Sequence, residues 1–115
     1  MKIIEHHGKI KLQYKQTVKH NKTTDKTTIP NEIIEYLNIK DTVYIYTNTH
    51  GQTTITTTKP HVEHHTTHVY KDHTINIPQT IIPSIPVEDK VILTLDLSRA
   101  DDYKNGLGLL TLTTP

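Results

Sequence analysis

The chain contains no cysteine, no phenylalanine and no tryptophan, and it has only four glycines among its 115 residues. Without cysteine it can form neither a disulfide bond nor a thiolate metal site, which fits a reducing compartment. It also lacks an apolar stretch long enough for a membrane span or for the core of a secretion signal, so we expect a cytoplasmic protein. The few glycines form no phosphate-binding or dinucleotide-binding motif, and no nucleophile motif is present, so we expect no cofactor and no enzymatic activity.

The core must be built from isoleucine, leucine, valine and six tyrosines, because apolar residues make up only 33% of the chain. A chain of this length is typical of one compact domain, here residues 1–115. Small domains bury a lower fraction of their surface than large ones, and oligomerisation often completes their cores. The composition therefore favours a homodimer.

Charge is distributed unevenly, although the formal net charge is only +1. Residues 1–30 carry seven lysines and two acidic residues, a net charge of +5, whereas the rest of the chain carries six basic and ten acidic residues, a net charge of −4. Contacts between lysine or arginine and phosphate supply most non-specific affinity for DNA, so the first segment predicts a polyanionic partner. The alternative is a solvated lysine-rich arm without a ligand.

Two parts of the chain are related in sequence. Residues 28–45 align without gaps with residues 76–93, sharing Ile-Pro, an Ile-Ile pair, Asp and Val in step. After a loop of different length, residues 51–60 align with residues 106–115, and Ile55 then corresponds to Leu110. Internal repetition of this kind indicates two copies of one structural unit. We therefore divide the domain into a first unit, residues 1–60, and a second, divergent unit, residues 61–115.

The first unit has the pattern of a strand, a short helix and a β-hairpin. Threonine-rich, β-branched residues favour a strand at 26–29, and Pro30 suits the first turn of a helix at 31–37. Ile33, Ile34 and Leu37 then share one face of that helix. Alternation and the turn at His50-Gly51 predict the strands 43–46 and 53–58.

The second unit repeats the pattern less regularly. It has an equivalent strand at 73–77, but Pro83 lies within the equivalent helix and predicts that this helix is broken. Its hairpin carries a longer, charged loop at 96–105, and loops of that length in small domains are often functional.

Residues 25–41, in which a strand leads through Ile29-Pro30 into a short helix ending at Leu37-Asn38-Ile39 before an acidic turn, resemble the AbrB/SpoVT swapped-hairpin family. The resemblance implies a mostly β fold with short helices, an AbrB-like swapped-hairpin or double-psi-like barrel made from two ββαβ repeats. It further implies a DNA-binding transcriptional regulator. Basic residues on the first strand and in the loop before the Ile-Pro strand contact DNA in such proteins, and the positions that match here are Lys15, Lys19, Lys22 and Lys26.

The sequence departs from the family pattern in ways that affect DNA recognition. Arginine is the usual reader of guanine, but this segment offers only lysine, which binds phosphate as a point charge. Asp25 and Asn38 stand where the family commonly has glycine, although asparagine tolerates a left-handed backbone. The second unit offers only Lys71 and His73 at the corresponding place, so the two halves are expected to bind DNA unequally.

Histidines gather at residues 61–68, where His61, Glu63, His64, His65 and His68 could bind zinc, nickel or copper. The segment follows the end of the first unit, and no second cluster supplies a distinctive ligand spacing. We therefore favour a polar linker or the first strand of the second unit, and we predict no metal site.

Two further alternatives concern a protein partner. The hydroxyl-rich segment 53–58 is expected to be a half-buried edge strand, and such an edge could also pair with a strand of another protein. More broadly, the same barrel could serve an antitoxin-like or inhibitor module that binds a toxin or a host factor instead of DNA. Salt-dependent DNA binding would distinguish the two functions.

Overall fold

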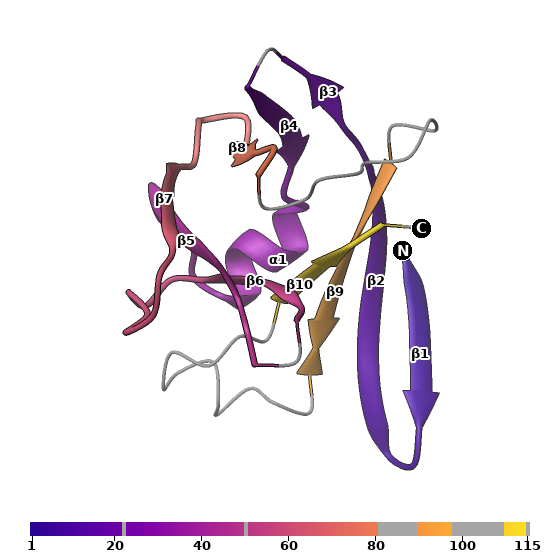
Figure 1. The fold of residues 1–115 in the computed structure, drawn as a ribbon. Helices are drawn as coiled ribbons and strands as arrows, with labels where there is room; N and C mark the ends of the chain where they lie inside the picture. The colour runs from indigo at the N-terminus through magenta and orange to yellow at the C-terminus, as the bar shows by residue number, and fades with distance from the viewer. Residues whose placement is uncertain (22, 50, 81–89, 98–109, 115) are drawn as a thin grey trace.

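The computed structural model describes residues 1–21, 23–49, 51–80, 90–97 and 110–114, whose arrangement is shown in Figure 1. These residues form ten strands and one short helix, which confirms the expected mostly β fold. In chain order the elements are β1 (Lys2–His6), β2 (Lys9–Thr17), β3 (Lys19–His20), β4 (Thr24–Thr28), α1 (Asn31–Tyr36), β5 (Thr42–Thr47), β6 (Thr53–Thr56), β7 (His65–His68), β8 (Thr74–Pro78), β9 (Lys90–Asp96) and β10 (Leu110–Thr113). No helix in this part of the chain is long and apolar enough to cross a membrane.

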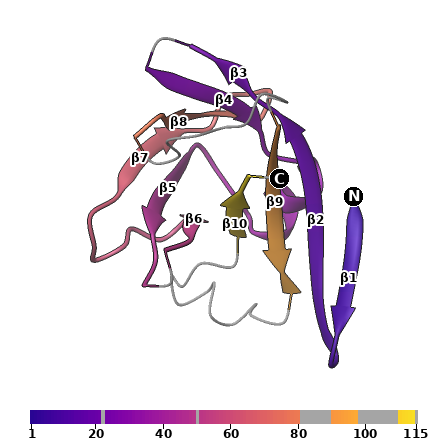
Figure 2. The same ribbon diagram turned by 45° about the vertical axis from the view of Figure 1, so that its right-hand side comes forward.

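The strands form two antiparallel sheets. The larger sheet has seven strands in the order β1-β2-β9-β10-β6-β5-β7, and the smaller has three in the order β3-β4-β8. Figure 2 shows the smaller sheet lying across one end of the larger, curved sheet. The larger sheet keeps two free edges, at β1 and β7, so the described strands do not close into the barrel that the sequence predicted.

Strand pairing is symmetric between the two halves of the chain. One residue before the aligned segments begin, Thr27 corresponds in step to Ile75, and these two residues are direct partners in the pairing of β4 with β8. Ile55 corresponds to Leu110, and they are direct partners in the pairing of β6 with β10. One strand of each half also pairs with the hairpin of the other half. Strand β2 pairs with β9, and β7 pairs with β5. This register is the one that two units related by a twofold axis would produce.

The hydrophobic core lies between the two sheets and is shared by both halves. It contains aliphatic side chains from every strand pair named above, together with one face of α1. Its fully or almost fully buried members are Tyr14, Val18, Ile29, Ile33, Leu37, Ile39, Val43, Ile45, Ile55, Val69, Ile75, Ile77, Val91, Leu93, Leu95, Leu110 and Leu112. Because neither half could cover these residues alone, the two halves must fold as one unit.

Helix α1 agrees closely with the prediction for residues 31–37. It begins after Pro30 and ends at Tyr36, with Leu37 as its C-cap residue, one residue earlier than expected. Ile33 and Leu37 are buried and Ile34 packs partly against the core, as the predicted face required. Asn38 then adopts a left-handed backbone with φ of 52°, the role for which asparagine can replace glycine.

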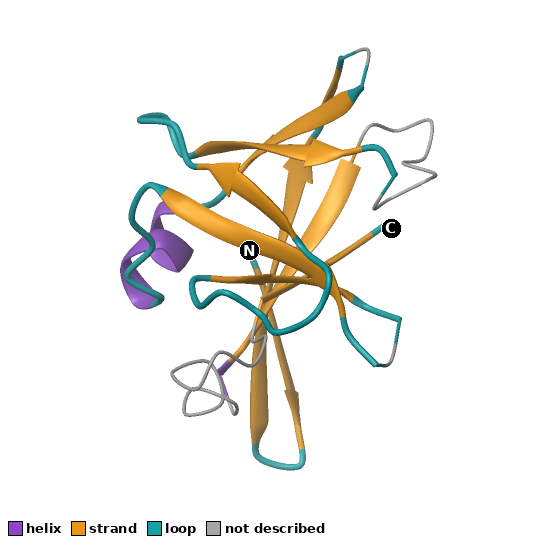
Figure 3. Ribbon diagram, turned by 60° about the vertical axis from the view of Figure 1, so that its left-hand side comes forward, coloured by secondary structure: helices purple, strands orange, loops and turns teal. Residues whose placement is uncertain are grey.

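The N-terminal hairpin of β1 and β2 was not predicted from the sequence. Its two-residue turn, His7-Gly8, has positive φ at both positions (51° and 76°), which matches the twist of the flanking strands. Figure 3 shows the hairpin extending away from the rest of the molecule. Ile3 and Ile10 are 62% and 38% exposed there, so the outer part of the hairpin does not contribute to the core.

The prediction of an edge strand at residues 53–58 is wrong. Strand β6 lies inside the larger sheet, with β5 on one side and β10 on the other, and Thr54 and Thr56 are fully buried. The strand that pairs with its second edge, β10, comes from the far end of the chain. Local sequence patterns do not show that two such distant segments pair. The predicted break at Pro83 and most of the predicted loop at 96–105 lie outside the described residues.

Candidate nucleic-acid interface

A broad open groove crosses the small sheet where the two halves of the chain meet. It has a volume of about 1010 Å³ and is lined by the ends of β2 and β7, by β3 and β4, and by the turn that leads into β8. This volume lies at the upper end of the range for small-ligand sites, about 300–1,000 Å³, and suits an extended ligand. The lining residues are Thr17, Lys19, Asn21, Lys26, Thr27, Thr28, His68, Tyr70, Lys71, Asp72 and Thr74.

Two of the predicted DNA-binding lysines lie in this groove and face each other. Lys19 on β3 and Lys26 on β4 are direct cross-strand partners, which places their side chains on the same side of the small sheet. Like charges directly opposite one another destabilise a sheet unless an anion lies between them. Lys71 from the second unit lines the same groove, so three lysines border one surface.

A third predicted lysine, Lys15, is not among the residues that line the groove. Lys15 is exposed on β2, opposite Ile92 of β9, and lies two residues before the groove-lining Thr17. Lys22 lies outside the described residues. His73, the weaker candidate of the second unit, occupies a left-handed turn with φ of 66° and does not line the groove.

The aromatic side chains of the groove were not predicted from the sequence. Tyr70 is 44% exposed and lies beside the ring of His68, at a centroid distance of 4.9 Å and an interplanar angle of 82°. The Lys26 ammonium is 5.8 Å from the centre of the Tyr70 ring, within range of a cation–π interaction. The sequence did contain one indication of this group, because His68, Tyr70 and Lys71 lie close together at the end of the first strand of the second unit.

One acidic side chain, Asp72, interrupts the basic surface. Hydrogen bonds from the side chain and the backbone N–H of Thr74 hold the pKa of Asp72 below its ordinary value, and the charge of Lys26 acts in the same direction. Asp72 is therefore fully ionised at neutral pH. Its negative charge opposes the approach of phosphate on the side of the groove that the second unit supplies.

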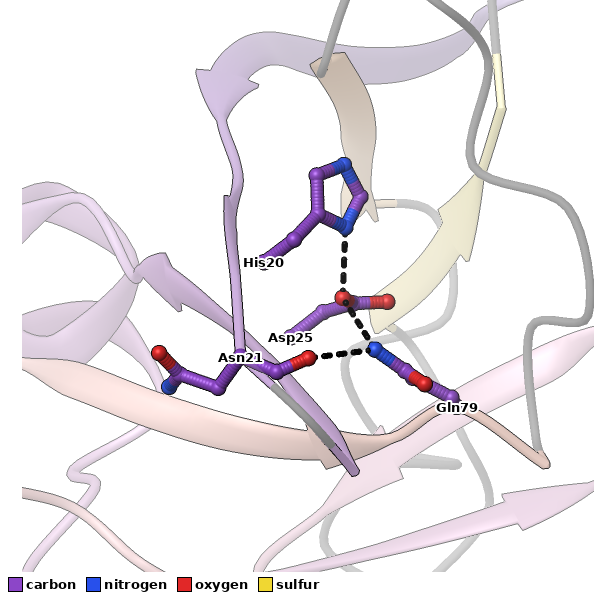
Figure 4. Close-up of polar contacts among 4 residues, drawn as sticks. All are labelled: His20, Asn21, Asp25 and Gln79. Carbon is purple, nitrogen blue, oxygen red and sulfur yellow. Dashed lines mark hydrogen bonds and ion pairs between the residues drawn. The ribbon is translucent and has the colours of Figure 1, made fainter.

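A buried polar cluster anchors the hairpin that carries Lys19 and Lys26 (Figure 4). Asp25 is only 2% exposed, and its carboxylate accepts a hydrogen bond from His20 Nδ1 at 2.7 Å and one from Gln79 Nε2 at 3.3 Å. Gln79 Nε2 also donates to the backbone carbonyl of Asn21 at 2.9 Å. A buried charge is tolerated only when it is hydrogen-bonded in this way. The cluster fixes the β3–β4 hairpin to the end of β8 and thereby fixes one wall of the groove.

The histidine-rich segment divides between two places. His64 packs edge-on against Tyr44 at 5.5 Å between ring centroids, whereas His68 packs against Tyr70. Glu63 and His65 line a separate hollow of about 430 Å³. The part of the chain that the structure describes contains no group of three or more histidine, aspartate or glutamate side chains arranged to hold a metal ion. Strand β7 begins at His65. The second half of the segment is therefore the first strand of the second unit, which was one of the two expectations.

Comparison of the chain with family models, with curated proteins and with solved structures found no match.

Proposed function

We propose that the protein is a DNA-binding regulator that holds the phosphate backbone in the groove between its two halves. The observation that carries the proposal is the convergence of Lys19, Lys26 and Lys71, two from the first unit and one from the second, on one open surface. Among the described residues Lys19 and Lys71 form no ion pair, so their charges are available to an anionic ligand.

The strand pairing supports our proposal that the protein is of the AbrB type. In the swapped-hairpin arrangement of the AbrB type, two units exchange hairpins. Here β2 pairs with β9 of the second unit and β7 pairs with β5 of the first. We propose that this chain is a single-chain version of that arrangement, in which one polypeptide supplies both halves.

The groove chemistry favours binding through phosphate over reading of base edges. Its cationic residues are lysines, which act as point charges, and its hydroxyl donors on Thr17, Thr28 and Thr74 can also reach phosphate oxygens. We therefore expect affinity to fall steeply with salt and to depend only modestly on the sequence of the DNA.

A fluorescence-anisotropy titration of a labelled 20-base-pair duplex tests the proposal. Replacing Lys19, Lys26 and Lys71 together by Gln is expected to weaken binding at 100 mM salt by at least about tenfold, roughly 1.4 kcal/mol. The slope of log affinity against log salt should fall by up to about 2.7, because each phosphate contact contributes about 0.9.

The matched control replaces Lys9, Lys11 and Lys59 by Gln, which removes the same charge from residues outside the groove lining. Lys9 and Lys11 lie at the start of β2, next to the turn of the N-terminal hairpin. This control variant should lose less than about threefold in affinity, as expected for long-range electrostatics alone. If the wild-type protein does not bind DNA at low salt, or if both triple variants lose affinity equally, the proposal is wrong.

A protein-binding module remains the second candidate, and the N-terminal hairpin is the observation that favours it. Strand β1 is an edge strand of the larger sheet, and Ile3 on it is 62% exposed. An exposed edge with an aliphatic side chain can accept a strand from another protein. Replacing Ile3 by Lys should abolish such binding and leave DNA binding unchanged, which would separate the two functions.

A further inference from the structure

Tyr70 is an aromatic side chain that the fold holds rigidly while leaving much of it in solvent. Among the described tyrosines only Tyr36 and Tyr70 are broadly exposed, at 51% and 44%. Tyr36 lies at the end of α1 and outside the groove lining, whereas Tyr70 lies among the three lysines. Tyr70 therefore offers an aromatic face to a ligand that lies in the basic groove.

The backbone and the ring of Tyr70 are both fixed. Its backbone N–H donates to Thr74 O at 3.0 Å and its carbonyl accepts from His73 N at 2.9 Å, so the turn is closed on both sides. The side-chain hydroxyl accepts from Asn76 Nδ2 at 3.4 Å, and the His68 ring supports the Tyr70 ring edge-on. A ring held in this way loses little further entropy when a ligand stacks on it.

The surroundings of the ring match the chemistry of a nucleotide. Lys26 is close to the Tyr70 ring, and Lys71 is its neighbour in sequence, so ammonium groups lie within reach of a phosphate attached to a stacked base. Proteins that bind single strands combine these two elements, a positively charged groove along the backbone and aromatic rings under the bases.

We propose that the groove binds an unpaired segment of nucleic acid, with one base stacked on Tyr70 and the flanking phosphates on Lys19, Lys26 and Lys71. The proposal rests on the nucleic-acid function argued above and specifies its substrate. In an intact duplex both faces of every base are covered by neighbouring bases, except at the two ends, so an internal base must leave the stack before it can lie on Tyr70. A single strand, or a duplex with an extruded base, is therefore the preferred ligand.

The test compares four labelled probes by fluorescence anisotropy at low salt: a 12-nucleotide dT strand, a 12-nucleotide U strand, a 12-nucleotide abasic DNA strand and a 12-base-pair duplex. The abasic strand carries the phosphates without the bases. For the wild-type protein we expect the dT or the U strand to bind at least about fivefold more tightly than the abasic strand and the duplex, because stacking of one base contributes about 1–3 kcal/mol. The tighter of the two strands shows whether the site prefers the thymidine DNA strand or the uridine RNA strand.

Substitutions assign the effect to Tyr70. Tyr70→Ala should reduce the affinity for the base-containing strand to that for the abasic strand, whereas Tyr70→Phe should retain it. Tyr36→Ala, which removes an equally exposed ring elsewhere, should change nothing. The chain contains no tryptophan, so tyrosine emission can be followed directly. The strand should quench emission of the wild type and of Tyr36→Phe, and Tyr70→Phe should lose that quenching.

The outcomes separate this proposal from the function on which it rests. If the abasic strand, the duplex and the base-containing strands all bind equally, or if Tyr70→Ala and Tyr36→Ala behave alike in a folded protein, the stacking proposal is wrong and phosphate binding survives. If none of the four probes binds at low salt, the nucleic-acid function itself fails. Thermal unfolding followed by circular dichroism verifies that each variant is folded.

Discussion

The two halves of the molecule share their strand pairing but differ on the surface that they present to the groove. Thr27 faces Ile75 and Ile55 faces Leu110, each residue opposite its own counterpart. Yet Lys26 of the first half corresponds to Thr74 of the second, and Asp25 corresponds to His73. The first half thus contributes opposed lysines, and the second contributes His68, Tyr70, Lys71 and Asp72.

This difference separates the residues that the shared core constrains from those that it leaves free to vary. Residues near the symmetry axis must fill the shared core and keep the register of both sheets, because a shift by one residue would move every side chain to the opposite face. Residues on the outer face of the small sheet meet no such constraint and have diverged. Since the groove lies where both halves meet, their divergence gives it two unlike sides, one with two opposed lysines and one with a lysine, an aromatic pair and an acidic side chain.

The largest expected effect tests whether the core of the two halves is equivalent. Ile55→Ala and Leu110→Ala should each lower the free energy of unfolding by about 2–5 kcal/mol, because each residue is fully buried against the other. Urea denaturation followed by circular dichroism measures both. The exposed Ile3→Ala should change stability by less than about 0.5 kcal/mol. A loss below about 1 kcal/mol at only one of the paired positions would contradict equal roles for the two halves.

A smaller effect tests the asymmetric polar anchor. Asp25→Ala should lower the free energy of unfolding by about 1–3 kcal/mol, because it leaves His20 Nδ1 and Gln79 Nε2 without their shared acceptor. The counterpart substitution His73→Asn should change stability by about 0.5 kcal/mol or less, since asparagine tolerates the left-handed backbone at that position. Urea denaturation of both variants decides the matter, and equal losses would argue that Asp25 has no special anchoring role.

The smallest effect concerns the acidic side of the groove. Asp72→Asn should strengthen binding of the 20-base-pair duplex by about twofold to threefold at 50 mM salt, because it removes one screened repulsion with phosphate. The lowered pKa of Asp72 means that this carboxylate stays ionised down to acidic pH. Its repulsion is therefore constant between pH 6 and pH 8, and the ratio of the two affinities should not change over that range. A ratio that falls towards one as the pH is lowered to 6 would contradict the assignment.

Several features were predictable from local sequence. The position of Pro30 and the apolar face formed by Ile33, Ile34 and Leu37 predicted helix α1 within one residue. The family pattern singled out Lys19 and Lys26, which lie together in the groove, along with Lys15, which does not. The N-terminal hairpin was missed even though Ile10, Leu12 and Tyr14 alternate with polar residues after Gly8.

The sequence by itself determined the mostly β composition, the position of the helix and the concentration of positive charge in residues 1–30, because propensity, proline placement and charge are local properties. Only the tertiary structure decided that β6 is an interior strand, that Asp25 is buried with His20 and Gln79, and that Tyr70 and Lys71 join Lys19 and Lys26. Each of these depends on partners far apart in the chain. Their pairing is set by where the whole core can be buried, a quantity that no single segment contains.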